Sequence, residues 1–209
     1  MAKIVKGVFI TFEGSEGCGK STQAKLLCDY LKNKNKKVMH IREPGGIKIS
    51  EKIRNILLDV RNEEMTKECE VLLYMAARAQ LVDEIIAPAL KKGIIVVCDR
   101  FLDSTLAYQG YGCGIDVKLI KQVGFFATKG IAPDVTFLLD METSKGLSRI
   151  KQSKDRIEQR SLEYHNRVRQ GYLSLAKKEP KRINVIQAND SKERIQELIQ
   201  ALVLKILKA

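Results

Sequence analysis

The chain has 209 residues, 44% of them hydrophobic, which suits one domain with a single core over residues 1–209. No apolar run approaches the roughly 20 residues of a membrane-spanning helix, and segment 1–7 leaves no room for a signal peptide, so we expect a cytoplasmic protein without membrane contact. The formal charge of +12 would suit a nucleic-acid binder, but the basic residues are dispersed apart from two local clusters, and no aromatic stacking motif accompanies them.

Strand-like apolar runs alternate with helical stretches along the chain. Strands are predicted at 8–13, 38–42, 94–99, 135–140 and 183–187, with helices from residue 20, up to residue 90, and over 191–207, where Ser191 is the predicted N-cap. The alternation predicts a parallel sheet, and the unbroken apolar run of the third strand indicates burial on both faces. We expect an α/β fold, a three-layer sandwich whose five-stranded parallel sheet is covered by helices on both faces.

The five cysteines are odd in number, widely spaced and without a CxxC pair, which argues against a disulfide framework and a zinc site. We interpret them as reduced thiols. Cys18 lies before a predicted helix, a position where thiols can be reactive, but a small space-filling role is the simpler interpretation.

A phosphate-binding loop follows the first predicted strand. Residues 14–21 read GSEGCGKS and fit GxxxxGK[ST] between a strand and a helix. The glycines let backbone N–H groups turn toward phosphates, Lys20 adds a positive charge, and the Ser21 hydroxyl can bind Mg²⁺. The loop alone predicts binding of a nucleoside triphosphate, and with it the α/β fold is expected to be of the P-loop NTPase type. The sequence has no NKxD segment of the kind that a GTPase needs. The predicted ATP-binding residues here are Gly14, Ser15, Glu16, Gly17, Cys18, Gly19, Lys20, Ser21 and Thr22.

Two charged residues end the third predicted strand, at the edge of an open α/β sheet where ligands gather. Asp99 can orient Mg²⁺ through water, which makes it a candidate metal residue beside Ser21, and Arg100 can clamp a phosphate. We predict that Asp99, Arg100 and Lys20 are catalytic. A structural ion pair at the strand end is the alternative.

Six segments occur in a family-specific order: FEGSEGCGKSTQ at 12–23, REPGG at 42–46, LLYMAARAQ at 72–80, DRFLDSTLAYQG at 99–110, APDVTFLLD at 132–140 and DRIE at 155–158. Together they resemble bacterial thymidylate kinase over nearly the whole chain. The combination is specific although each piece is not. The resemblance implies a homodimer that transfers the γ-phosphate of ATP to dTMP, giving dTDP and ADP, with Mg²⁺ as cofactor.

The resemblance also implies a thymine-binding wall. Tyr74 would stack on thymine and Arg78 would donate to its O4, and the two lie one helical turn apart, so they can face one cleft. Gln109 would hydrogen-bond the base edge through a carboxamide that can both donate and accept. Ser104 and Thr105 would line the same wall. Without the resemblance, Tyr74 would be interpreted as a core aromatic.

For the dTMP phosphate and sugar, the matching positions are mainly charged. Arg54 and Arg100 would clamp the phosphate as two guanidinium forks. Glu16 would accept a hydrogen bond from the sugar 3′-hydroxyl, with Glu43 and Pro44 forming the adjoining wall. Arg42 stays open between a third clamp and a structural ion pair.

A further cation is expected from a lid. Some thymidylate kinases have an arginine where this chain has Gly17, whereas the bacterial form supplies one from a mobile lid, and segment 149–160 is basic enough to be that lid. Arg156, in the DRIE match, is the predicted catalytic cation. Arg149 is predicted to bind ATP by packing on the adenine face, or else to be a solvated helix charge.

Two other functions share part of this pattern. Another nucleoside monophosphate kinase or a deoxynucleoside kinase would have the loop and the fold, but not Tyr74, Arg78 and Gln109 together. A basic nucleic-acid-binding P-loop ATPase would bind DNA or RNA in a salt-sensitive way. We expect ATP and dTMP as partners, and neither nucleic acid nor a membrane.

Overall fold

A computed structural model describes residues 7–151 and 155–207. Most of the N-terminal segment discussed above, and residues 152–154 of the predicted lid, lie outside these ranges. In the described ranges no helix combines the length and the apolar character that crossing a bilayer requires.

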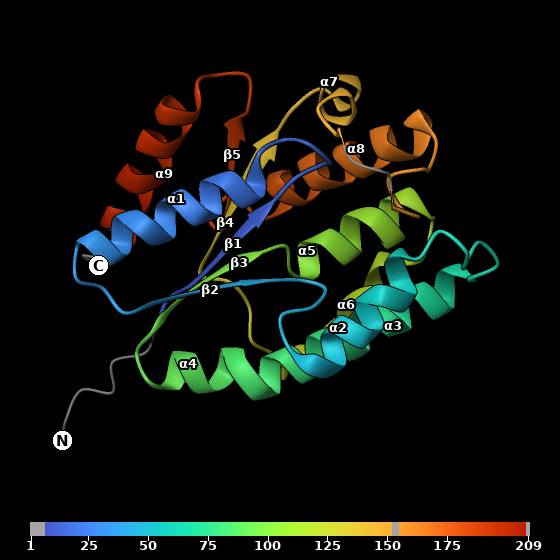
Figure 1. The fold of residues 1–209 in the computed structure, drawn as a ribbon, viewed down its shortest axis with the longest axis horizontal. Helices are drawn as coiled ribbons and strands as arrows, with labels where there is room; N and C mark the ends of the chain where they lie inside the picture. Colours follow the sequence, from blue (N-terminus) through green and yellow to red (C-terminus); the bar gives the residue numbers. More distant parts are fainter. Residues whose placement is uncertain (1–6, 152–154, 208–209) are drawn as a thin grey trace.

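One sheet organises the molecule (Figure 1). Its strands lie in the order β2-β3-β1-β4-β5, and every neighbouring pair is parallel. The predicted five-stranded parallel sheet is confirmed, with each predicted strand boundary within one residue. The strands are β1 (Phe9–Glu13), β2 (Val38–Arg42), β3 (Ile95–Asp99), β4 (Val135–Asp140) and β5 (Ile183–Gln187).

Two long helices cover one face of the sheet, α1 (Lys20–Asn33) and α9 (Lys192–Ile206) (Figure 1). Leu27 of α1 and Ile199 of α9 are fully buried in one cluster with alternate side chains of the strands, such as Ile10 and Phe137. Ser191 caps α9 by accepting a hydrogen bond from the Arg194 N–H, as the sequence predicts.

The remaining long helices lie on the opposite face (Figure 1). Phe9, Val96 and Cys98 point there and meet the helices that follow β2, so helices cover both faces and the predicted three layers are confirmed. A second apolar cluster joins α3, α6, α8 and η2 beside the sheet. The elements are α2 (Lys48–Leu58), α3 (Lys67–Leu81), the π-helical η1 (Val82–Ile86), α4 (Ala87–Lys91), α5 (Leu102–Thr105), the π-helical η2 (Leu106–Gly112), α6 (Val117–Thr128), α7 (Thr143–Ser148) and α8 (Leu162–Lys178).

The sheet topology brings the site residues to one edge. Because all strands are parallel, the loop after β1, the loop after β2 and the Asp99-Arg100 pair after β3 meet at their carboxyl ends. Asp99 pairs in register with Phe12 on one side and Arg42 on the other. The phosphate loop therefore lies beside Asp99 and Glu43.

Candidate active site

The loop between β1 and α1 has a backbone that requires glycine. Gly17 and Gly19 have φ angles of 68° and 94°, in the left-handed region that favours glycine. A Cβ on Gly17 would lie 2.0 Å from the carbonyl oxygen of Gly146 in α7, and one on Gly146 would lie 2.3 Å from the Glu16 carbonyl oxygen. The loop and α7 thus touch through backbone atoms, and this close approach leaves no room for an arginine at position 17.

Two oxygen-bearing side chains meet beside this loop. The Ser21 hydroxyl donates to the Asp99 carboxylate, which brings the two predicted metal residues into contact. Hydroxyl and carboxylate oxygens are ligands that Mg²⁺ prefers, usually as one or two protein groups completed by phosphates and water. Within the described residues no cluster of three or more His, Cys, Asp or Glu side chains could hold a metal by itself. The donor set fits an Mg²⁺ ion shared with a bound phosphate.

The Lys20 side chain contacts the phosphate loop that precedes it. The side chain is buried, and Nζ donates to the Ser15 carbonyl oxygen at 2.7 Å and approaches the Cys18 thiol at 3.6 Å. The ammonium group therefore lies inside the loop before any ligand binds. A cavity of about 380 Å³ opens in front of it, lined by Glu16, Gly17, Gly19, Lys20, Ser21, Thr22, Arg42, Glu43, Arg54, Asp99, Arg100 and Arg149.

Arg100 connects the loop to the neighbouring cavity. Its backbone has a φ of 71°, and its guanidinium donates to Glu16 Oε1 at 2.8 Å and to the Gly14 carbonyl oxygen at 3.1 Å. Tyr108 donates to the same Glu16 oxygen at 2.6 Å. Burial alone would raise the pKa of Glu16, but the charges of Arg100 and Lys20 and the Tyr108 hydrogen bond outweigh it and lower that pKa to about 2. Glu16 is therefore ionised throughout the neutral range.

A second carboxylate lies beneath Arg100. Glu13 is fully buried, and its carboxylate accepts from the Phe101 N–H at 2.7 Å, from Ser104 Oγ at 2.6 Å and from the Tyr172 hydroxyl at 2.8 Å. Burial and the charge of Asp103 raise the pKa of Glu13 to about 7. Sequence reasoning did not single out Glu13 or Tyr172. Glu13 lies within the matched segment 12–23 but before the GxxxxGK[ST] pattern, so that segment was the one signal for it, whereas a tyrosine on a distant helix carries no motif signal.

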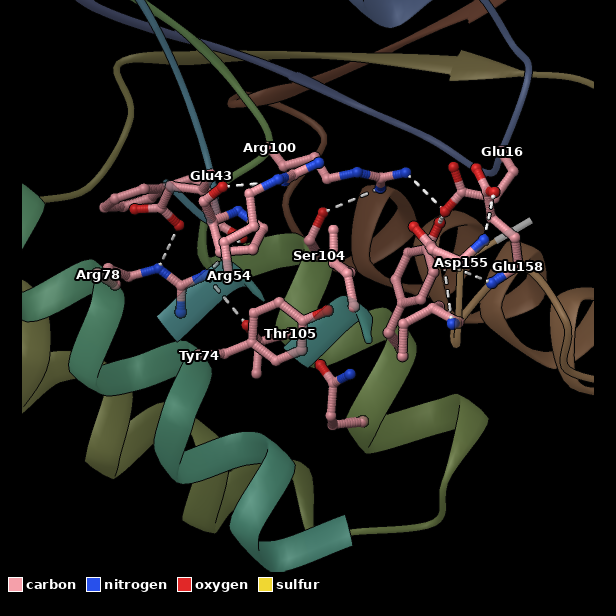
Figure 2. Close-up of a pocket in the computed structure, with 16 residues that line it drawn as sticks. Glu16, Glu43, Arg54, Tyr74, Arg78, Arg100, Ser104, Thr105, Asp155 and Glu158 are labelled. Atoms are coloured by element: carbon pink, nitrogen blue, oxygen red, sulfur yellow. Dashed lines mark hydrogen bonds and ion pairs between the residues drawn. The ribbon is translucent and has the colours of Figure 1, made fainter. Parts of the chain in front are cut away.

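Figure 2 shows the second cavity, which has a volume of about 150 Å³. It adjoins the first, because four residues line both: Glu16, Glu43, Arg54 and Arg100. Its lining includes all ten residues that the resemblance implies for dTMP: Glu16, Glu43, Pro44, Arg54, Tyr74, Arg78, Arg100, Ser104, Thr105 and Gln109. The structure brings these residues together from five separate segments of the chain. Sequence reasoning did not assign the other lining residues, Leu58, Phe101, Tyr108, Asp155, Ile157 and Glu158, although all of them except Leu58 lie within the matched segments.

Arg78 is held by a buried ion pair at one end of this cavity (Figure 2). The side chain is 2% exposed, and Nε donates to Glu43 Oε2 at 2.8 Å. Nη2 donates to the Phe101 carbonyl oxygen and to Thr105 Oγ1, both at 3.0 Å. Burial raises the pKa of Glu43 although Arg78 opposes the shift. Arg78 is thus fixed in direction before a ligand enters.

Arg54 and Arg42 both bond the backbone next to Glu43. Each donates to the Pro44 carbonyl oxygen, at 3.0 and 2.9 Å. Arg42 also pairs with Glu51 at 2.8 Å on the exposed side of the loop. Because Arg42 lines the first cavity and carries this ion pair as well, the structure supports both of the alternatives left open for it.

The predicted lid residues separate in the structure. Arg149 is exposed, follows α7 and lines the first cavity beside the phosphate loop. Arg156 instead is buried: Nη2 donates to Glu70 Oε2 at 2.6 Å and Nε to the Leu57 carbonyl oxygen at 2.8 Å. The structure thus does not bring Arg156 to the phosphate loop, because the buried Glu70 carboxylate holds its guanidinium. Arg160 donates to the same Glu70 oxygen at 2.6 Å.

Comparisons with known proteins agree on one family. The family model described as thymidylate kinase matches residues 12–199. A thymidylate kinase of Geobacter sulfurreducens is 50% identical over 195 residues, covering 90% of this chain and 92% of the relative. One of Pelotomaculum thermopropionicum is 46% identical over 204 residues, covering 96% and 93%. The crystal structure of thymidylate kinase from Ehrlichia chaffeensis aligns with a TM-score of 0.77 at 38% identity, covering 94% of this chain and 99% of that one.

Proposed function

Since the chain belongs to the thymidylate kinase family, whose members are phosphotransferases acting on dTMP, we propose that its two adjoining cavities hold ATP and dTMP. The observation that carries this assignment is the shared wall. Glu16, Glu43, Arg54 and Arg100 line both cavities, so a γ-phosphate in one can meet an acceptor phosphate in the other.

On the donor side, the backbone N–H groups of residues 14–19 bind the ATP phosphates. Lys20 supplies a positive charge from within the loop, and Arg149 lies at the mouth of the same cavity, in reach of the adenine or the phosphates. Ser21 and Asp99 would hold Mg²⁺. When bound, the ion neutralises phosphate charge and helps to align the transferring group.

On the acceptor side, Arg54 and Arg100 bind the dTMP phosphate, and Glu16 accepts from the sugar hydroxyl. Arg78, with Thr105 beside it, donates to O4 of thymine. Tyr74 stacks on the ring and Gln109 bonds the base edge. Glu43 and Pro44 close the wall between base and phosphate, where Glu43 also orients Arg78.

The chemistry needs alignment and charge compensation more than a strong base. An oxygen of the dTMP phosphate is already an anionic nucleophile; it forms a bond to the γ-phosphorus as the bond to the β-γ bridging oxygen breaks, and ADP leaves. Lys20 and Arg100 flank this path as catalytic cations, with Asp99 as the catalytic metal residue. Arg156, the lid cation that the sequence predicts, is bonded to the buried Glu70 and could act on the phosphates only after leaving it, so the main role proposed for it here is to pair with Glu70.

We further propose that residues 1–209 form one domain with a lid at 149–160. The single sheet, which runs from residue 9 to residue 187, supports the first part, and the exposed Arg149 at the cavity mouth supports the second. A cytoplasmic location is supported by the five cysteines, all of them free thiols, which suit a reducing compartment.

A homodimer is also proposed, formed through the face of α2, α3 and α6. Helix α3 packs between α2 and α6, and the three helices carry exposed apolar side chains, with Phe125 and Phe126 69% and 84% exposed. The others are Ile49, Ile56, Leu72 and Leu119. Sedimentation velocity tests this: the wild type should sediment as a dimer and Phe126→Asp as a monomer. A monomeric wild type would contradict the proposal.

The function is tested by a coupled ADP-release assay with all common nucleoside monophosphates as acceptors. We expect turnover with dTMP to exceed turnover with each of the others, and EDTA to stop it. Comparable turnover with several monophosphates would favour a broader nucleotide kinase. Salt-sensitive retention of DNA or RNA on filters, without acceptor-dependent turnover, would favour a nucleic-acid-binding ATPase.

A further inference from the structure

Glu70 is a fully buried carboxylate at the base end of the dTMP cavity, and the reaction as described above does not use it. It lies on α3, and its two oxygens have different partners. Oε1 accepts from Gln109 Nε2 at 2.7 Å. Oε2 accepts from the Nη2 atoms of Arg156 and Arg160, both at 2.6 Å.

These contacts fix the direction of the Gln109 side chain. A carboxylate paired with two guanidinium groups can only accept hydrogen bonds, so it binds the NH₂ end of the Gln109 amide and rejects the carbonyl end. Gln109 is 2% exposed and lines the cavity. With its NH₂ group directed to Glu70, the amide presents its carbonyl oxygen as the group available to a ligand.

A fixed carbonyl oxygen distinguishes pyrimidines by their N3 atom. Thymine and uracil carry a hydrogen on N3 and can donate to it, whereas cytosine has a lone pair there and an amino group at C4. The Nη2 hydrogens of Arg78 are taken by Phe101 and Thr105. Nη1, whose protein partner is the Met75 sulfur at 3.2 Å, keeps one hydrogen for a ligand, and this donor favours a carbonyl at C4 over that amino group. A buried acceptor that meets a second acceptor loses its hydrogen bond and is left desolvated, which penalises cytosine strongly.

We propose that Glu70 is a positioning residue that sets base specificity by holding the Gln109 amide with its oxygen toward the ligand. The inference rests on the proposed binding of thymine beside Gln109. It assigns Glu70 the selection of bases with a donor at N3, independently of the thymine methyl group.

The test compares kcat/KM for dTMP, dUMP and dCMP in the wild type and in Glu70→Gln. A glutamine at position 70 can accept or donate, so the Gln109 amide can rotate by 180° and present either end to the ligand. We therefore expect the dTMP-to-dCMP ratio of kcat/KM to fall about 10-fold or more, toward the weak discrimination of sites that do not select a base by hydrogen bonds. The dTMP-to-dUMP ratio should stay within about 3-fold of the wild type, because these two bases share the same N3 and O4 groups.

A double-mutant comparison identifies Gln109 as the intermediary. Gln109→Met keeps the side-chain length but removes the amide, so it should lower the dTMP-to-dCMP ratio by itself. Adding Glu70→Gln to Gln109→Met should then change that ratio by less than about 2-fold, since coupled residues are not additive. Independent, multiplying effects would overturn the proposal.

Two results separate this role from packing and from the proposed function. If Glu70→Gln is active but lowers kcat/KM equally for all three nucleotides, Glu70 only supports the fold and the inference is wrong. If Glu70→Gln does not fold, Glu70→Asp replaces it: the charge opposite Arg156 and Arg160 remains, the reach to Gln109 shortens, and the same fall in ratio is expected. A wild type inactive on dTMP would instead refute the proposed function.

Discussion

The two ends of the joined cavity are built on different principles. At the proposed phosphate end, residues 14–21 are one contiguous stretch, the loop after β1 and the start of α1, and the groups proposed to bind ligand are backbone N–H groups, Lys20 and Ser21. At the base end, the contacts join side chains that are far apart in sequence. Arg78 and Glu43 are 35 residues apart, and Arg156 and Glu70 are 86 apart.

This difference has energetic consequences. A backbone donor survives a side-chain substitution, so replacing Lys20 removes one charge and leaves the loop in place, whereas Gly17 and Gly19 cannot be replaced without backbone strain. At the base end every polar contact belongs to a buried ion pair or hydrogen bond. Removing one partner leaves an uncompensated charge in the core, which costs about 3–5 kcal/mol. Recognition of the base and stability of the fold are therefore coupled, whereas phosphate transfer and stability are nearly separate.

Lys20→Ala gives the largest expected effect and tests the phosphate end. The variant loses the charge that accompanies the transferring phosphoryl group, so kcat should fall more than about 100-fold. The dTMP Kd, measured by calorimetry, should change little because Lys20 does not line the second cavity. Turnover above a hundredth of the wild-type value would refute the assigned role, and a large loss of stability would refute the separation of the two ends.

Arg78→Ala tests the base end. It removes the proposed donor to O4 and strands the buried Glu43 carboxylate, so the KM for dTMP should rise at least about 10-fold, with the KM for ATP nearly unchanged. The free energy of unfolding should fall by about 3 kcal/mol or more.

The matched control is Glu43→Gln combined with Arg78→Ala. Removing both charges should restore part of the stability but none of the dTMP affinity. Equal rises in both KM values of the single variant would show that Arg78 supports the fold and does not read the base.

Arg156→Ala tests whether Arg156 acts on the phosphates or supports the base end through Glu70. If Arg156 is the catalytic lid cation that the sequence predicts, its loss lowers kcat at least about 100-fold with steady KM values, the pattern of an interaction made only in the transition state. The structure favours a different outcome, because Arg156 is bonded to Glu70 and Leu57. We expect about 1–3 kcal/mol lower stability and a higher KM for dTMP, with kcat changed less than about 10-fold.

Arg160→Ala is the control for that variant, since Arg160 bonds the same Glu70 oxygen. Similar effects in both would assign both arginines to the support of Glu70. A fall in kcat confined to Arg156→Ala would show that this side chain leaves Glu70 during the reaction and acts on the phosphates.

The same contrast explains how much the sequence could predict. All five strands and the cap at Ser191 were predictable, because apolar period and capping chemistry are local properties. The phosphate loop was predictable because its residues are contiguous and the motif specifies the residue type at each key position, with glycines for the turn, Lys20 for the charge and Ser21 for Mg²⁺. Of the ten dTMP positions, Arg100 could be proposed from its place at the end of a strand. The roles of the others could be proposed only through the resemblance, since nothing local distinguishes Tyr74 from a core aromatic.

Other features depend on long-range packing and could not be predicted. Glu70 and Glu13 are acidic residues in ordinary helix and strand sequences, and only the fold shows that their surroundings are buried. The burial of Arg156 follows from Glu70, because a buried carboxylate requires a cation, but the pairing of residues so far apart has no sequence signal. The contact of Gly17 with Gly146 was equally hidden, although it accounts for the absence of a side chain at position 17.

Glu13→Gln gives the smallest expected effect and concerns the residue that joins the two ends. Its carboxylate bonds Ser104 and Tyr172, and both of these contact Arg100. Burial and the charge of Asp103 raise the pKa of Glu13 from 4.5 to about 7. Between these two pH values the folded protein keeps the Glu13 proton, whereas the unfolded chain has lost it. The stabilisation by the protonated form is therefore present below about pH 4.5 and is lost as the pH rises through about 7.

Chemical denaturation of the wild type and of Glu13→Gln at pH 5 and pH 8 measures this contribution. Glutamine has nearly the same shape; its oxygen can accept from the Phe101 N–H while its NH₂ group donates to a hydroxyl, so the variant should fold. Between the two pH values the wild type should lose about 1–3 kcal/mol more stability than the variant, because only the wild type must ionise a buried group. Parallel losses in the two proteins would show that Glu13 is ionised at both pH values, with Arg100 and the hydroxyl donors sufficient to hold the charge. In that case Glu13 would be an anion throughout this pH range and would position Arg100 by its charge. The charge network that joins the two ends of the cavity would then not respond to pH between 5 and 8.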